Sequence, residues 1–263
     1  MSQYHPPGLI GLICDPDHEV FVRVADRLEQ RGFQVEFFEP GRRLDAGTIE
    51  DLDLLANKKV DPESFGALRY AAQHGITTWN GYTTVILGAR LIGLKALETV
   101  GFQVPETSLE KPDGDYVAKS LFDWHYEVDP ELNGEGAIYQ ELLPSAPIDD
   151  KYYGVDTGTE IDVGVLRSTS KLYGRKEPLE LIEPDPIIAS NVRQLMALTD
   201  SQAIGVDIIW SNGEPYAVDV NPAMSFRHAE MEADLADSMA ARLTSPAARA
   251  RSGRTAIQTT TNE

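Results

Sequence analysis

Two aspartates and an asparagine near the carboxyl end of the chain have the types and spacing of a metal site. Asp207 and Asp219 each lie in a short run of apolar residues, and Asn221 follows the second run. The Asn-Gly pair at 212–213 is typical of a tight hairpin turn, because both residues tolerate positive φ. If the hairpin closes around residues 212–214, Asp207 lies roughly opposite Asp219, and strand alternation turns Asn221 to the same side as Asp219. Facing carboxylates repel one another, and this all-oxygen set suits a Mg²⁺ ion that also holds substrate phosphates.

An acidic surface hairpin on a strongly acidic protein is the alternative interpretation of these residues. On a solvated strand face, apolar residues normally alternate with Lys, Thr or Ser. Asp207 and Asp219 are instead embedded in apolar strands. That setting favours the metal site.

The charge of the chain limits its partners. The 263 residues carry a formal net charge of −19, with 42 acidic and 23 basic side chains. Nucleic acids and anionic membranes attract clustered Lys and Arg, so neither is expected as a partner. A nucleotide remains compatible, because a few local cations together with Mg²⁺ can offset the general field. An acid excess with few lysines also resembles proteins adapted to concentrated salt.

Cysteine content and hydropathy indicate the compartment. Cys14 is the only cysteine, which excludes an intrachain disulfide and favours a reducing compartment. The sequence shows no signal-peptide pattern and no apolar run long enough to span a bilayer. A cytoplasmic protein is therefore expected, and its oligomeric state is not predicted.

Short apolar runs alternate with amphipathic segments in the first 79 residues. Strands are predicted at 8–14, 35–38, 53–56 and 76–79, with helices at 20–31 and 62–73. This rhythm is typical of a parallel sheet with right-handed crossovers, a Rossmann-like lobe over residues 1–79. No G-x-G-x-x-G follows the first strand, so a dinucleotide site is not predicted.

The rest of the chain is predicted to form a small central α+β lobe over 80–143 and a sheet lobe over 144–243. The expected helices are 89–100, 187–198 and 231–243, and the expected strands, besides the hairpin, are 116–119, 137–144 and 160–166. Residues 244–263 lack an apolar period and read as a disordered tail. The fold class is α/β.

A family resemblance follows from the order of these motifs. Gly205-Val206-Asp207, a hairpin, then Asp219-Val220-Asn221-Pro222 resembles the metal-binding end of the ATP-grasp enzymes, especially the RimK-type amino-acid ligases. Further landmarks occur in the family's order from about residue 80 to 235. The resemblance implies an ATP-grasp fold that binds ATP and Mg²⁺, with Asp207, Asp219 and Asn221 as the metal ligands.

The resemblance also implies an ATP site. Arg90 and Lys119 take the places of phosphate-contacting cations, although a surface arginine and a solvated lysine are the alternatives. Glu141 matches the residue that contacts the adenine amine. The backbone of Leu142 and Leu143 matches the segment that contacts the adenine edge.

Other cations match the family more loosely. Asp149 and Lys151 match an acid near the ribose and a cation near the phosphates, and a one-residue gap leaves Asp150 as the alternative for the ribose. Arg167 and Lys171 fall where such ligases have an arginine that stabilises an acyl-phosphate, and they are the predicted catalytic residues.

Two segments depart from the family pattern. The segment 120–125 stands where the family has a Gly-rich loop that closes over the phosphates, so the lid is expected to be short or rebuilt. After Asn221, Phe226 fits the loop that approaches the acceptor, but the usual glycine is replaced. His228 is more readily a surface histidine than a general base.

The implied activity is a carboxylate–amine ligase that acts through an acyl-phosphate. Its partners would be a small-molecule or peptide carboxylate and an amine acceptor. A small-molecule kinase resembling the inositol polyphosphate kinases is the second interpretation, since these share the fold and lack a pronounced Gly-rich lid. A non-catalytic nucleotide-binding relic is the third, although the intact metal set argues against it.

Overall fold

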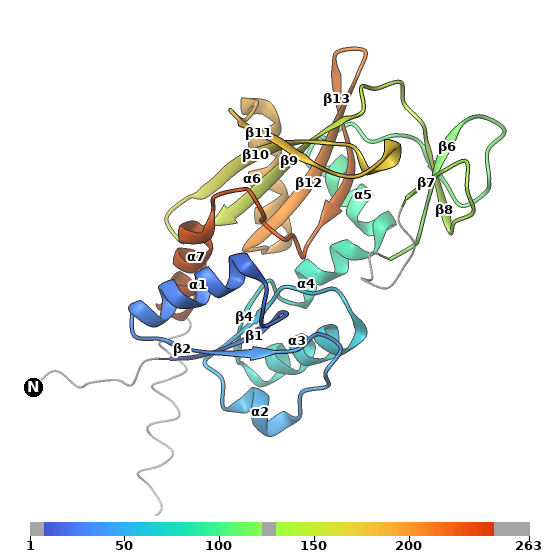
Figure 1. Cartoon of the computed structure of the whole chain (residues 1–263). Helices are drawn as coiled ribbons and strands as arrows, with labels where there is room; N and C mark the ends of the chain where they lie inside the picture. Colours follow the sequence, from blue (N-terminus) through green and yellow to red (C-terminus); the bar gives the residue numbers. More distant parts are fainter. Residues whose placement is uncertain (1–7, 123–129, 245–263) are drawn as a thin grey trace, which may run out of the picture.

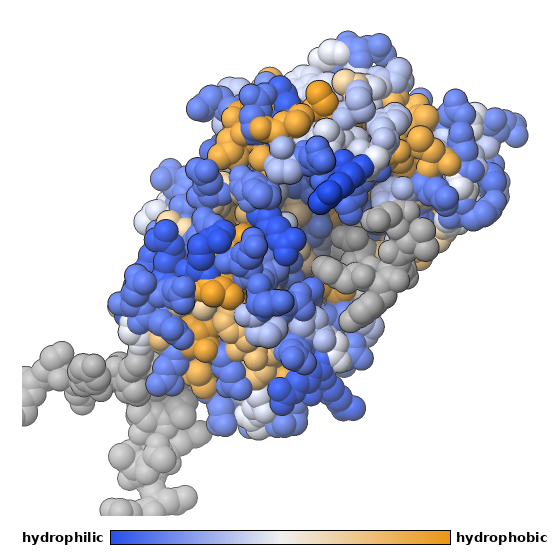
Figure 2. Space-filling model, viewed as in Figure 1, coloured by the Kyte–Doolittle hydropathy of each residue, from blue (hydrophilic) through white to orange (hydrophobic). Residues whose placement is uncertain are grey.

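The computed structural model of the chain describes residues 8–122 and 130–244. Figure 1 shows three sheets, with helices packed between and beside them. In the described part, no helix combines the length and the apolar character that crossing a bilayer requires. Figure 2 shows a largely hydrophilic face with apolar patches, one of them over the region of β10 and β11 in Figure 1.

The first sheet is parallel, as predicted from the alternation of strands and helices. Its strand order is β2-β1-β3-β4. The strands are β1 (Leu9–Ile13), β2 (Gln34–Phe38), β3 (Leu54–Asn57) and β4 (Thr77–Trp79), and the helices are α1 (Glu19–Gln30), α2 (Ala46–Glu50) and α3 (Pro62–His74). Asp61 caps α3 in a reciprocal pair with Ser64, and Gly75 ends the helix at φ 79°. These local signals explain why the boundaries of α3 were predictable.

A second, small sheet follows a helical connection. The connection is made by α4 (Tyr82–Val85), the 3₁₀ helix η1 (Ile86–Gly88) and α5 (Arg90–Thr99). The sheet is antiparallel with the order β5-β8-β6-β7, formed by β5 (Thr107–Ser108), β6 (Tyr116–Lys119), β7 (Glu131–Leu132) and β8 (Ile138–Glu141). Its two central strands, β6 and β8, are those expected from the sequence.

The third sheet is antiparallel, with the order β11-β10-β9-β12-β13. It contains β9 (Ile148–Asp156), β10 (Ile161–Thr169), β11 (Pro178–Ile182), β12 (Ala203–Ser211) and β13 (Glu214–Asn221), with the 3₁₀ helix η2 (Lys171–Tyr173) between β10 and β11. Helix α6 (Pro186–Thr199) packs on one face, and Val192, Leu195 and Met196 share a core with the sheet. Helix α7 (Glu232–Thr244) packs against α1 and joins the core of the first sheet.

Two strands of the third sheet were absent from the sequence prediction. The central strand β9 begins with polar residues, among them Asp149, Asp150 and Lys151, which hide the alternation of a buried strand. Strand β11 lies at the sheet edge, where Leu179 and Leu181 are exposed, in a segment that the sequence marks only as acidic and Pro-rich. Neither strand has the apolar pattern on which strand prediction depends.

Asn80 joins the end of the first sheet to the third. Its side-chain Oδ1 accepts hydrogen bonds from the backbone N–H groups of Gln202 and Ala203, at 3.0 and 2.9 Å. Its Nδ2 donates to the carbonyls of Ala203 and Pro222, at 2.6 and 3.2 Å. The residue has φ 50°, a left-handed conformation that asparagine tolerates better than most residues. The start of β12 and the exit of β13 are thereby fixed to the same side chain.

Candidate active site

Strands β12 and β13 form the predicted hairpin, but the turn between them has two residues, 212–213, and not three. Asp207 nevertheless lies directly opposite Asp219, because the register shifts by one residue after Asp207. Val220 points into the core and is 2% exposed. Asp207 and Asp219 are half-buried, so their charges require partners.

Each aspartate has its own cation in the structure. Lys151 Nζ on β9 lies 3.1 Å from Asp207 Oδ1. Arg90 at the start of α5 donates to Asp219 Oδ2 in a close ion pair. The repulsion between the two acids is therefore offset by two basic side chains that reach the hairpin from different segments.

Close packing of α5 on β13 places Arg90 over Asp219. A Cβ atom at Gly93 would lie 2.6 Å from Val220 Cγ1 and 2.7 Å from the carbonyl oxygen of Leu87. A glycine is needed here because any larger side chain would push the helix off the strand. Arg90 itself is buried, at 6% exposed.

Lys119 reaches the same hairpin from β6. Its Nζ donates to the backbone carbonyl of Val218, at 2.7 Å, and to Gln140 Oε1, at 2.7 Å. Gln140 was not among the predicted site residues, although it precedes the predicted Glu141. Its amide Nε2 is buried and has no hydrogen-bond partner among the described residues. A donor of this kind beside a lysine can serve a bound polar group.

A lysine that was not predicted from the sequence, Lys176, also contributes to the charge at Asp207. Burial acts to raise the pKa of Asp207, but Lys151, Lys176 and Lys119 outweigh it and hold the pKa below its ordinary value. Lys176 follows η2 and also lies 3.9 Å from Asp149. Burial lowers the pKa of Lys176, against the opposing effect of Asp207. No sequence pattern marks Lys176, because it reaches the site only through the turn between β10 and β11.

The register of β9 separates the two candidate ribose acids. Residues directly opposite in antiparallel strands share a face, and Lys151 pairs with Asp207. Asp149, two residues away, is on the same face as Lys151, and Asp150 is on the other. Burial and the charge of Asp207 raise the pKa of Asp149. Of the two acids, Asp149 is therefore the one near the cation cluster at the hairpin, which consists of Arg90, Lys119, Lys151 and Lys176.

The structure does not bring Arg167 to this cluster. Arg167 on β10 pairs with Asp150, on the sheet face opposite Asp207. Its guanidinium makes two hydrogen bonds to the Asp150 carboxylate, at 2.8 and 2.9 Å. Trp210 Nε1 donates to the same carboxylate, at 2.9 Å. These contacts give Arg167 a structural task on the α6 side, and its catalytic role stays a prediction that the sheet geometry does not support.

The remaining predicted residues lie in η2, at the end of β8 and directly after it. Lys171 is exposed in η2. Glu141 is exposed and neighbours Gln140 on β8, so it points to the face opposite Lys119. The backbone N–H of Leu142 donates to the carbonyl of Asp115, at 3.2 Å, and Leu143 is buried. Their roles at adenine stay predictions.

The hairpin residues fit a magnesium ion. In residues 8–122 and 130–244, no three His, Cys, Asp or Glu side chains are grouped as metal ligands, so the set depends on Asn221 for its third oxygen. Asn221 Oδ1 accepts from the backbone N–H of Ala223, at 2.8 Å, which orients it and leaves a second lone pair. The surrounding lysines hold the pKa of Asp207 below its ordinary value, and oxygen ligands of this kind are those that Mg²⁺ prefers.

The loop after Asn221 has an unusual backbone. Phe226, His228 and Glu230 have φ of 53°, 61° and 58°, and left-handed values are uncommon outside glycine. Phe226 is buried and packs on Tyr153 with ring centroids 5.1 Å apart. Phe226 therefore anchors the loop to the third sheet, whereas His228 is exposed.

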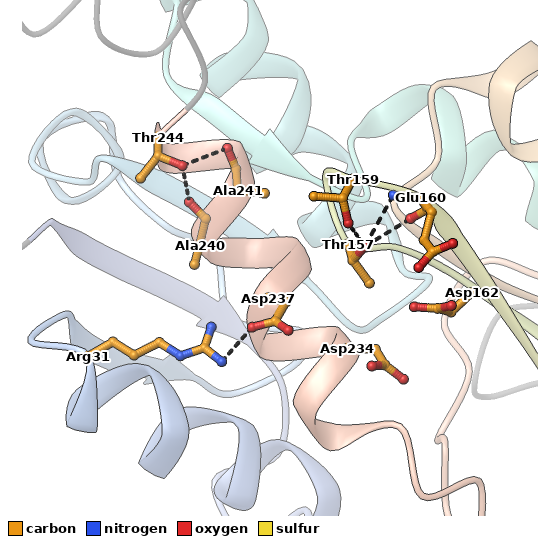
Figure 3. Close-up of a pocket in the computed structure, with 10 residues that line it drawn as sticks. All are labelled: Arg31, Thr157, Thr159, Glu160, Asp162, Asp234, Asp237, Ala240, Ala241 and Thr244. Atoms are coloured by element: carbon orange, nitrogen blue, oxygen red, sulfur yellow. Dashed lines mark hydrogen bonds and ion pairs between the residues drawn. The ribbon is translucent and has the colours of Figure 1, made fainter.

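A separate acidic hollow of about 400 Å³ opens between α7 and the turn from β9 to β10. Figure 3 shows Asp162 and Asp234 close to one another, and Arg31 paired with Asp237, at 2.5 Å. Burial and the charge of Asp162 raise the pKa of Asp234. None of the predicted site residues is among the residues that line this hollow.

Comparison with known proteins gives structural matches. No protein-family model matches the chain, and no curated protein matches it. The fold is similar to that of D-cycloserine synthetase DcsG, with a TM-score of 0.68 and 14% identity over 90% of this chain and 100% of that one. A RimK domain ATP-grasp protein from Sphaerobacter thermophilus has a TM-score of 0.66 and 16% identity, over 88% and 99%. ATP-grasp ligase PsnB in complex with a minimal precursor has a TM-score of 0.66 and 14% identity, over 89% and 99%.

Proposed function

Because the chain has the ATP-grasp fold, we propose that it is an ATP- and Mg²⁺-dependent ligase that joins a carboxylate to an amine through an acyl-phosphate. One observation carries this proposal. Arg90, Lys119 and Lys151 come from three separate segments and all contact the hairpin that bears Asp207 and Asp219.

The cations are suited to bind the ATP phosphates. Arg90 and Lys151 now neutralise the two aspartates, and Lys119 donates to a backbone carbonyl beside Asp219. With ATP bound, the same groups can donate to phosphate oxygens, while Asp207, Asp219 and Asn221 would hold Mg²⁺. The ion would supply neutralisation of the charge on the phosphates.

The catalytic task of the chain's own residues is positioning and electrostatic stabilisation. In phosphoryl transfer, negative charge spreads over the oxygens of the transferred group, and fixed cations stabilise it. Lys119 is held by two acceptors, Gln140 Oε1 and the Val218 carbonyl, so its ammonium is fixed before ligand arrives. Lys176 adds a further positive charge on the same side of the hairpin.

The structures similar in fold support the class of substrate. They include PsnB and macrocyclase MdnC of Microcystis aeruginosa in complex with precursor peptides, and D-cycloserine synthetase DcsG. PsnB has also been solved with Mg and ADP. These likenesses favour a peptide or a small molecule as the substrate that supplies the carboxylate.

The first test is calorimetric titration with a non-hydrolysable ATP analogue, with and without Mg²⁺. The parent protein is expected to bind the analogue only when Mg²⁺ is present. Asp219→Asn keeps the shape of the side chain but removes its charge, and should weaken Mg²⁺-dependent binding at least about tenfold, or about 1.4 kcal/mol. Glu214→Ala is the matched control, because Glu214 is an exposed acid on the same strand.

The second test is turnover. ADP release together with a new amide mass, from mixtures of ATP with carboxylates and amines, is the expected result. A phosphorylated hydroxyl product without an amide would establish the kinase interpretation instead. Nucleotide binding without any turnover would favour the non-catalytic relic, and absence of nucleotide binding by the parent protein would contradict the proposal.

A further inference from the structure

Within residues 8–122 and 130–244, a lysine of the first lobe is buried without a counter-ion. Lys58 directly follows β3 at the carboxyl edge of the parallel sheet and is 4% exposed. Its Nζ donates to the backbone carbonyl of Ala223, at 2.5 Å. No carboxylate among the described residues forms an ion pair with it. An ammonium group has three donor protons, and a buried charge without a partner is destabilising.

The neighbouring acidic groups do not neutralise Lys58. Burial raises the pKa of Cys14 to about 12, so the thiol is uncharged at neutral pH. Asp15 is engaged by Lys59, whose Nζ lies 2.8 Å from Asp15 Oδ2. Burial lowers the pKa of Lys58 to about 8, which still leaves it largely protonated at pH 7. The cluster therefore has an excess of positive charge in a chain whose net charge is −19.

Further groups around Lys58 favour an anion. The twelve-residue helix α1 begins beside it, and no side-chain hydrogen bond caps its first turn. Helix amino termini attract anions. His18, at that terminus, is 7% exposed, and its Nδ1 has no hydrogen-bond partner in the described part of the chain. The charge of the exposed Arg227 lowers the pKa of both His18 and Lys58, which places Arg227 near both.

We infer that Lys58, Arg227 and the first turn of α1 bind an anionic group, a carboxylate or a phosphate, of the substrate. Lys58 would lie at the base of this anion site and Arg227 at its exposed rim. Ala223 connects it to the candidate metal site, because its N–H donates to Asn221 and its carbonyl accepts from Lys58. Calling the ligand a substrate rests on the proposed function, whereas the anion site itself requires neither ATP nor Mg²⁺.

The anion site is distinct from the cation cluster at the hairpin. Arg90 and Lys151 each have an aspartate partner, whereas Lys58 has a neutral carbonyl. An entering anion would supply the missing counter-charge. A substrate that carries an anionic group in addition to its reacting carboxylate could therefore be held at two points, which Ala223 connects.

The experiment follows the lysine Cε signals of ¹³C-lysine-labelled full-length protein by NMR, without nucleotide. Succinate and inorganic phosphate are the probes, titrated separately at constant ionic strength against KCl. The chain has eight lysines, so the signal of Lys58 can be assigned by its loss in Lys58→Met. The expected result is a saturable shift of that signal, and the probe that binds more tightly identifies a carboxylate or a phosphate.

Two variants test the assignment. Arg227→Gln changes an exposed residue and should weaken the binding of the probe at least about tenfold. Lys95→Gln changes an exposed lysine on α5 and should leave the affinity for the probe unchanged. A shift that does not saturate, or equal affinity in Arg227→Gln, would overturn the inference. Asp219→Asn should weaken Mg²⁺-dependent nucleotide binding but keep the anion affinity, so failure of the anion site and failure of the ligase proposal are distinguishable.

Discussion

At the scale of single residues, charge in this protein is arranged in local pairs. Lys151 and Arg90 each hold one acid of the hairpin, and Arg167 holds the buried Asp150 on the opposite face. Removing one member of a buried pair leaves the other without compensation, at a cost of about 3–5 kcal/mol. Asp219→Asn also removes the charge that pairs with Arg90, but it keeps the shape of the side chain and an acceptor oxygen, so it is a better test of ligand binding than a truncation.

His18 provides a prediction about pH. Burial and the charges of Lys58 and Arg227 lower its pKa from 6.5 to about 4, so the folded protein holds the imidazole neutral. As the pH falls, the unfolded chain takes up this proton before the folded protein does. The contribution of the neutral imidazole to the free energy of unfolding is therefore complete above pH 6.5 and is lost as the pH falls toward 4. The parent should lose about 3 kcal/mol more unfolding free energy over this window than His18→Gln, from 1.36 kcal/mol per pKa unit.

Urea unfolding at pH 7, 6, 5 and 4 measures this difference. His74→Gln is the control, because His74 is exposed at the end of α3, and it should follow the parent curve. Parallel curves for the parent and His18→Gln would show that the fold does not exclude the proton from His18.

At the scale of elements, contact between α5 and β13 decides whether Arg90 reaches Asp219. Gly93 lies at that contact. Gly93→Ala should destabilise the protein by about 1–3 kcal/mol, because a Cβ there overpacks Val220 and the Leu87 carbonyl. Gly66→Ala in α3 is the matched control, since nothing lies within 4 Å of its added Cβ. That variant should be stabilised by about 0.4–1 kcal/mol.

Chemical denaturation of both variants measures the two changes in the free energy of unfolding. Nucleotide-analogue affinity should fall in Gly93→Ala and remain unchanged in Gly66→Ala, since only the first moves Arg90. Equal stability of the two variants would mean that α5 and β13 can separate without strain.

Local signals explain which elements the sequence could predict. The hairpin was predictable because Asn212-Gly213 marks its turn. The turn alone would place Asp207 opposite Val218, and the register shift after Asp207 brings Asp219 opposite it instead. Strand β9 was not, since Asp149-Asp150-Lys151 gives no apolar period. The face on which Arg167 lies depends on the pairing of β10 with β9, so its separation from the site could not be inferred without that strand. Lys176 and Lys58 come to their sites through tertiary packing alone.

At the scale of the whole molecule, the net charge of −19 acts against the compact state by self-repulsion. Salt screens this repulsion, with a Debye length of about 10 Å at 0.1 M and about 3 Å at 1 M. The melting temperature should therefore rise by several degrees between dilute buffer and 1 M KCl. Exposed ion pairs weaken in salt too, but each contributes about 0–1 kcal/mol.

Differential scanning calorimetry across a KCl series checks this expectation. A sucrose series serves as the control for solute exclusion, which stabilises without screening. The greatest stability in dilute buffer would show that ion pairs, and not net repulsion, dominate the electrostatics of the fold.

The direct pairing of Asp207 with Asp219 also restricts how chain length can change during evolution. Arg90, Lys119 and Lys151 reach the hairpin on segments joined by connecting chain, and surface loops tolerate insertions at small free-energy cost. The hairpin does not share this freedom. The turn and the register shift after Asp207 together set this pairing, so one residue gained or lost between the two acids would slip the register and send Asp219 to the opposite face of the sheet. In descendants of this protein, the segments that connect the cations can thus become longer. The number of residues between the two acids is expected to stay the same, because the strand register depends on it.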